Sequence, residues 1–189
     1  MKELVIKDTK DELAAFQWGR LSVYFIVFGV FGWAFETAYV WIRFGRFTYR
    51  GYLFSHISFI WGLPFIEMYA IGGIIVLMLF HQLEKRPIKL FFLGSVAMTI
   101  FELIGSYFCT FFFQKSFWNY SNELLNFDGR ICLIASIGWG ILSVIAICVI
   151  KPIIEKIYDV LKEKSIMQYC TTVFMVYMFI CAFYKYILL

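Results

Sequence analysis

Apolar runs separated by short charged stretches set the pattern of this chain. A helix needs about 20 apolar residues to cross the hydrocarbon core of a bilayer. We therefore predict an all-α fold, a polytopic transmembrane helical bundle, with five spans at roughly residues 21–41, 55–80, 88–113, 131–150 and 166–188. We expect one transmembrane domain over residues 21–189, preceded by a cytoplasmic amphipathic segment at residues 1–20.

The composition of the chain supports a membrane location. The chain is 62% hydrophobic and only 16% charged, whereas soluble domains are about 45–50% apolar and about 25% charged. The net charge of +4 reflects basic residues in short loops, where membrane topology alone predicts them. We therefore expect membrane lipid as a partner and no nucleic acid.

The distribution of Lys and Arg residues predicts the orientation of the spans. With five spans, eleven of the 17 basic residues lie on the side of the N-terminus and six on the other side. Short loops rich in Lys and Arg stay in the cytoplasm. We therefore expect a multi-pass protein with the N-terminus inside and the C-terminus outside.

Residues 152–164 differ from the other loops, because apolar residues recur there at helical spacing and charged residues fill the opposite face. Pro152 fits the first position of a helix. Two interpretations stay open. The segment is either a helix lying at the membrane surface or a docking helix for a cytoplasmic partner, such as a separate ATPase subunit.

Each of the first three predicted spans contains one carboxylate: Glu36, Glu67 and Glu102. Charged groups inside a bilayer are costly, so they usually face a protein interior or a water-filled cavity and indicate a function. The alternative is that they form hydrogen bonds between helices and serve only stability. Glu67, which follows Pro64, is the weakest candidate. We expect Glu36 and Glu102 to converge on one pocket.

The stretch 117–140 combines many hydrogen-bonding groups with an apolar run. Its first half is aromatic and polar, turns at Asp128-Gly129 and places Arg130 before the fourth predicted span. We expect residues 117–129 to form an ordered polar-aromatic cap or re-entrant segment, with its apolar side chains packed inward. Arg130 can bridge a carboxylate through two hydrogen bonds, and we expect that partner to be Glu36 or Glu102.

Cysteine and histidine give no sign of metal chemistry. The five cysteines lie in or beside apolar runs, without a Cys-x-x-Cys motif, and His56 and His81 are far apart in the sequence. We therefore predict no metal site and no cofactor.

Several short motifs carry a family resemblance. They are Gly32-Trp33-x-x-Glu36, Arg50-Gly51-Tyr52-Leu53, Trp61-Gly62, Glu102-x-x-Gly105-Ser106, Trp118-x-Tyr120-Ser121, Asn126-Phe127-x-Gly129-Arg130-Ile131-Cys132-Leu133 and Ser136-x-x-Trp139-Gly140. Over roughly residues 20–150, the chain resembles the bacterial family of ABC-transporter type IV permeases. It departs from that family after Arg50, where Ser55-His56-Ile57-Ser58-Phe59 replaces a Gly-Pro-x-x-Pro stretch.

The resemblance implies a transport protein of the bacterial cytoplasmic (inner) membrane. The chain has no Gly-x-x-x-x-Gly-Lys-Ser/Thr phosphate loop. If the protein belongs to an ATP-driven transporter, a separate chain must therefore supply the ATPase.

Three functions are consistent with these residues. The leading hypothesis is a permease-like protein, as a homo-oligomer or as the membrane subunit of an ABC-type transporter, with an exterior-facing polar pocket for a small or amphiphilic ligand. The alternatives are an intramembrane enzyme acting on a lipid or lipid-linked substrate, for which we assign no catalytic residue, and an accessory or assembly subunit. The expected ligand-binding residues are Glu36, Arg50, Glu102, Trp118, Tyr120, Ser121, Asn126, Arg130, Ser136 and Trp139.

Overall fold

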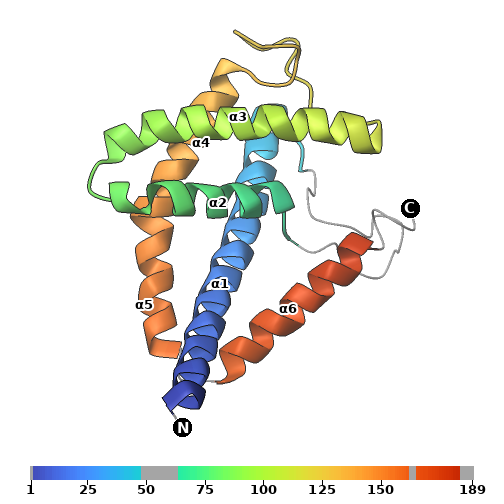
Figure 1. Cartoon of the computed structure of the whole chain (residues 1–189). Helices are drawn as coiled ribbons and strands as arrows, with labels where there is room; N and C mark the ends of the chain where they lie inside the picture. Colours follow the sequence, from blue (N-terminus) through green and yellow to red (C-terminus); the bar gives the residue numbers. More distant parts are fainter. Residues whose placement is uncertain (1, 48–63, 162–164, 184–189) are drawn as a thin grey trace. The chain divides into compact units, whose positions relative to one another are not determined.

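The computed structural model describes residues 2–47, 64–161 and 165–183 of the chain. These residues form helices and connecting loops, and they contain no β-strand, so the predicted all-α class is confirmed (Figure 1). The elements are α1 (Lys2–Phe44), α2 (Glu67–Phe80), the 3₁₀ turn η1 (His81–Leu83), α3 (Pro87–Phe113), α4 (Leu133–Ile145), the π-helical segment η2 (Ala146–Ile150), α5 (Lys151–Leu161) and α6 (Ser165–Phe183).

Five apolar helical segments lie at the positions of the five predicted spans. Three of them are long and apolar enough to cross a membrane: Trp18–Phe44, Pro87–Phe113 and Leu133–Tyr158. Two are shorter, Glu67–Leu83 and Tyr169–Ile180. The beginning of the second predicted span and the end of the fifth lie outside the described residues. This is a multi-pass helical membrane protein.

The chain divides into two compact units. Residues Met1–Ile74 and Ile154–Leu189 form one, which we call the α1–α6 unit, and residues Ile75–Ile153 form the other, which we call the α3–α4 unit. The helix α1 runs from Lys2 without a break through the boundary expected after residue 20. The predicted division into a segment 1–20 and a domain 21–189 stays a prediction.

Aromatic rings fill the core of the α1–α6 unit. Phe65 is fully buried and packs against Phe25 of α1 and Phe174 of α6, with ring centroids 5.4 and 5.8 Å away. A Cβ atom at Gly29 would come within 2.1 Å of the Phe65 ring. Glycine at this position therefore lets the ring lie directly on the α1 backbone.

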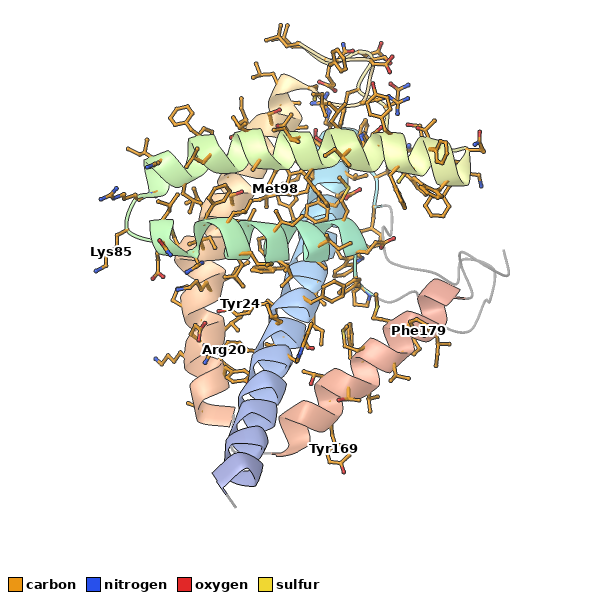
Figure 2. All side chains as sticks on the ribbon, viewed as in Figure 1. Arg20, Tyr24, Lys85, Met98, Tyr169 and Phe179 are labelled. Atoms are coloured by element: carbon orange, nitrogen blue, oxygen red, sulfur yellow. The ribbon has the colours of Figure 1, made fainter. Side chains whose placement is uncertain are left out.

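A polar cluster joins α1 to α5 in the same unit (Figure 2). Tyr24, almost fully buried, donates a 2.6 Å hydrogen bond to Glu155 Oε1. Arg20 forms an ion pair with Glu155 Oε2 at 3.2 Å and lies over the Tyr158 ring, 5.1 Å from its centroid. These contacts fix one face of α5.

Small residues bring α3 and α4 close together. Every fourth residue of α3 from Leu90 to Ser106 is buried, the spacing that forms a ridge along one side of a helix. A Cβ atom at Gly94 would meet Ser143 at 2.5 Å, and one at Gly140 would meet Ser95 Oγ at 2.2 Å. The two helices therefore pack with their backbones in near contact, as small residues permit in membranes.

The helix does not begin anew at Pro152. Helical backbone continues from α4 through η2 into α5. Pro152 has no N–H group to bond the carbonyl oxygen of Cys148, and the preceding Lys151 N–H bonds to Ala146 O, five residues back. Local π-helical geometry lets a helix accommodate a proline without ending. The helix expected at residues 152–164 is therefore the continuation of the fourth span, as far as the described residues extend.

Candidate functional site

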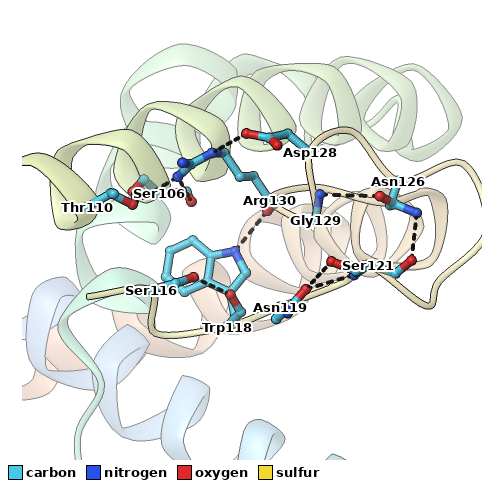
Figure 3. A network of polar contacts seen from close by, with 10 residues as sticks. All are labelled: Ser106, Thr110, Ser116, Trp118, Asn119, Ser121, Asn126, Asp128, Gly129 and Arg130. Carbon is cyan, nitrogen blue, oxygen red and sulfur yellow. Dashed lines mark hydrogen bonds and ion pairs between the residues drawn. The ribbon is translucent and has the colours of Figure 1, made fainter. Parts of the chain in front are cut away.

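The loop between α3 and α4, residues 114–132, is folded into a fixed structure that we call the cap (Figure 3). Tyr120 N–H donates to Gly129 O at 2.8 Å, and Phe127 N–H donates to Ile131 O at 3.0 Å. Asp128 and Gly129 form its turn, both with positive φ angles, of 53° and 64°. The predicted ordered cap before the fourth span is confirmed.

Two asparagines hold the cap together. Asn119 Oδ1 accepts hydrogen bonds from the N–H and the hydroxyl group of Ser121, at 2.9 and 2.6 Å. Asn126 Nδ2 donates to Ser121 O and Glu123 O, while its Oδ1 accepts from Gly129 N–H. Asparagine side chains commonly replace backbone partners in this way within turns. Ser121 and Asn126 thus use these groups within the cap, and their role in ligand binding stays a prediction.

Arg130 ties the cap to α3. Its Nη1 donates to Ser106 Oγ at 3.0 Å and to Thr110 Oγ1 at 2.9 Å, and its guanidinium carbon lies 4.2 Å from the centroid of the Tyr107 ring. Its Nε forms a 2.9 Å ion pair with Asp128 Oδ2. The side chain is thus delivered inward, onto α3, as predicted.

The expected pairing of Arg130 with Glu102 is wrong. Asp128 lies two residues before Arg130 in the same turn of the cap, so its carboxylate reaches the guanidinium group directly. Glu102 lies on a different element, α3. Glu102 instead accepts a 2.9 Å hydrogen bond from the Tyr120 hydroxyl group of the cap. Glu36 belongs to the other unit, and its pairing with Arg130 stays a prediction.

Glu102 is the most deeply placed charged group of the α3–α4 unit. It lies about three helical turns before the end of α3, and only 3% of its surface is exposed. The Trp139 indole approaches the same carboxyl group, yet Oε2 has no partner at hydrogen-bonding geometry among the described residues. A buried acceptor in this state is costly and calls for a functional explanation.

Three further candidates lie in the cap and in α4. Trp118 donates its indole N–H to Arg130 O at 2.8 Å and so joins the beginning of the cap to its end. Ser136 accepts a 2.7 Å hydrogen bond from Thr99 of α3 and donates to Cys132 O. Trp139 is buried on the same side of α4. The structure therefore brings Glu102, Trp118, Tyr120, Arg130, Ser136 and Trp139 together around the α3–α4 packing.

Two candidates lie elsewhere. Glu36 is half-buried in α1, in the α1–α6 unit, so its convergence with Glu102 stays a prediction. Arg50 lies outside the described residues. Among the residues that the structure describes, no group of three His, Cys, Asp or Glu side chains is placed to hold a metal ion.

Sequence reasoning missed some of the partners and misjudged the apolar residues of the cap. Tyr107, Thr110 and Asp128 contact Arg130. The hydroxyl groups of Ser106 and Thr110, one helical turn apart on α3, could have indicated a site for the Arg130 side chain. Trp118 and Tyr120 are half-buried as expected. The expected packing is wrong for the other apolar residues, which are exposed: Phe117, Leu124, Leu125 and Phe127.

The comparison with known proteins agrees with the membrane fold. The family described as "Putative ABC-transporter type IV" matches residues 23–185, which include the cap and both helices that hold it. No curated protein and no solved structure matches the chain. The chain belongs to this family, and the protein is an ABC-transporter-related membrane protein.

Proposed function

We propose that the protein is the membrane subunit of an ABC-type transporter and that Glu102 and the cap form an exterior-facing polar pocket for a small or amphiphilic ligand. One observation carries this proposal. Glu102 is buried inside a span, its Oε1 is bonded to the cap through Tyr120, and its Oε2 has no hydrogen-bond partner among the described residues. Carboxylates that are kept inside a membrane usually serve a function.

The groups around Glu102 suggest what the ligand carries. A hydroxyl or ammonium group would give Glu102 Oε2 the donor that it lacks. An anionic group would compete with Asp128 for Arg130, whose planar guanidinium group holds carboxylates and phosphates through paired hydrogen bonds. The buried Trp139 ring offers an apolar wall. A zwitterionic or amphiphilic molecule fits this set of groups.

The proposed orientation follows from the Lys and Arg count: N-terminus inside, and the cap on the exterior side of the cytoplasmic membrane of a bacterium. A separate ATPase subunit would then meet α5 from the cytoplasm. The exposure pattern of α5 supports this, because Ile154 and Tyr158 are buried whereas Ile153, Ile157 and Val160 are at least half exposed. Assembly of several copies of the chain stays a prediction.

The test is the small-molecule content of the purified protein. We expect protein extracted in mild detergent to retain a small or amphiphilic molecule in native mass spectrometry, and Glu102→Gln to lose it. Glu123→Gln, which makes the same change at a half-buried carboxyl group of the cap, is the matched control. Equal retention by all three proteins would contradict a pocket at Glu102.

One observation favours a second candidate, an accessory subunit whose polar groups only stabilise the fold. Asn119, Ser121 and Asn126 bond mainly within the cap. Under this alternative, Glu102→Gln would change the melting temperature of the protein but leave its content of small molecules unchanged.

A further inference from the structure

The cap exposes apolar side chains beside its polar ones, while Tyr120 and Arg130 reach inward to α3. Of its apolar residues, Leu124 is 72% exposed, Leu125 73%, Phe127 57% and Phe117 50%. We call these four residues the apolar cap face. In water such an arrangement would be unfavourable, because each large apolar side chain gains free energy when it leaves water.

Backbone hydrogen bonds fix this arrangement. Glu123 N–H donates to Tyr120 O, Leu133 N–H donates to Leu124 O at 3.3 Å, and Asn126 holds the carbonyl group of Glu123. Leu125 has a φ of 52°, in the left-handed region that residues with a Cβ rarely adopt. The cap therefore holds its leucines outward in a conformation that leucine does not favour.

The cap lies beside the last turns of α3. Tyr120 bonds Glu102, about three helical turns before the end of α3. Arg130 bonds Ser106, which lies about 10 Å before that end at 1.5 Å per residue. Helix α3 has 27 residues and is about 40 Å long, whereas the hydrocarbon core is about 30 Å thick. The turns of α3 that contain Glu102 and Ser106 therefore lie within the hydrocarbon core, and the cap reaches the same depth.

The apolar cap face is continuous with exposed apolar surfaces of both helices. The Phe117 ring contacts the Phe113 ring edge-on, with centroids 6.2 Å apart. Phe113 continues into the exposed rings of α3 at Phe108 and Phe112. On the other side, Leu124 O accepts a hydrogen bond from the N–H of Leu133, the first residue of α4. The exposed residues of α4 include Ile134, Ile137 and Ile141.

From this continuity and depth we propose that the apolar cap face is embedded among the acyl chains of the lipid leaflet at the C-terminal end of α3. The exposed faces of membrane-spanning helices meet acyl chains, and the apolar cap face adjoins these surfaces at Phe117 and Leu124. Lys115, exposed at the start of the cap, can extend its ammonium group to a lipid headgroup. The cap is thus a re-entrant anchor that lies in one leaflet.

Nitroxide labels test where these side chains lie. In a variant with all native cysteines replaced by alanine, Leu124→Cys, Leu125→Cys and Phe127→Cys are labelled one at a time and inserted into phosphatidylcholine–phosphatidylglycerol vesicles. We expect each label to collide several-fold more often with oxygen, which concentrates in lipid, than with a water-soluble nickel chelate. Asn122→Cys, at an exposed polar position of the same cap, is the control and should show the reverse.

Two results would overturn the proposal. Labels at 124, 125 and 127 that meet the nickel chelate as often as the label at 122 would place the face in water. Labels shielded from both reagents would place it against protein, either a partner or a second copy. If the labelled variants fail to fold, benzoylphenylalanine at position 127 of the otherwise native chain replaces them, with lipid adducts supporting the proposal and protein adducts contradicting it. Neither outcome depends on a ligand at Glu102.

Discussion

At the scale of single residues, Gly129 is the position where the cap has least freedom. Its φ is 64°, and a Cβ atom there would lie 2.6 Å from Ser121 Oγ and 2.9 Å from Asn119 Oδ1. Left-handed backbone alone costs a residue with a side chain about 1–2 kcal/mol. We expect Gly129→Ala to lower the melting temperature of the detergent-solubilised protein and to speed amide hydrogen exchange in the cap.

Gly138 provides the matched control for this substitution. It lies in α4, and a Cβ atom there would meet nothing within 4 Å. Because alanine favours helix over glycine by about 1 kcal/mol, Gly138→Ala should be neutral or stabilising. Equal destabilisation by both substitutions would show that the stability of the cap does not depend on the turn geometry at Gly129.

Tyr120 is the residue through which the cap meets the buried carboxyl group. Tyr120→Phe removes only the hydroxyl group, and with it the hydrogen bond that Glu102 Oε1 accepts from the cap. Losing one partner of a buried polar group costs about 1–3 kcal/mol. We expect Tyr120→Phe to destabilise the protein by this amount in thermal unfolding.

The control is Tyr107→Phe, which retains the ring over Arg130 and should have little effect. Combining Tyr120→Phe with Glu102→Gln gives a double-mutant cycle. Additive effects of the two substitutions would show that the hydroxyl–carboxyl contact does not couple the cap to α3.

At the scale of elements, an ion pair joins the turn before α3 to the start of α5. Lys151 Nζ lies 2.6 Å from Glu84 Oε2. The hydrogen bond and the positive charge of Lys151 hold the pKa of Glu84 below its usual value. A carboxyl group with a lowered pKa in the folded state stabilises that state above its unfolded pKa, about 4.3, and this contribution is lost as the pH falls through the folded pKa.

We therefore expect the melting temperature of the native protein to exceed that of Glu84→Gln near pH 7, and the difference to vanish as the pH falls well below 4.3. Melting curves of both proteins at a series of pH values would measure this. The effect is small because the carboxyl group is exposed. A difference that persists unchanged in strong acid would rule out ionisation of Glu84 as its cause.

The helices and the cap of this protein could be predicted from its sequence, whereas several side-chain contacts could not. The close α3–α4 packing at Gly140 follows from small residues in an apolar run, and the ordered cap follows from its asparagines and the Asp128-Gly129 turn. The partner of Arg130 could not be predicted, because a nearby aspartate and a distant glutamate are chemically alike. The exposure of Leu124 was misjudged, because packing inward is the rule for residues in water.

At the scale of the whole molecule, topology is the prediction with most consequences. Eleven basic residues against six predict that the N-terminus lies inside. Val160, exposed on α5, should then face the cytoplasm and Glu123 the exterior. In intact cells, a membrane-impermeant maleimide should label Glu123→Cys but not Val160→Cys in a variant without native cysteines. Labelling of position 160 alone would reverse the orientation, and with it the side from which a ligand enters.

The π-helical segment η2 accommodates one residue more than an ordinary α-helical turn. Successive residues of an α-helix are turned by about 100° about its axis, and η2 spreads its turn over one additional residue, with Lys151 N–H bonded five residues back. Deleting one residue between 146 and 150 would let this turn close as ordinary α-helix. The residues after the turn would then keep about the same direction around the helix axis, because one complete turn is made with or without the additional residue. A one-residue deletion should therefore be tolerated in η2, whereas the same deletion in an ordinary α-helical turn would rotate the residues that follow by about 100°.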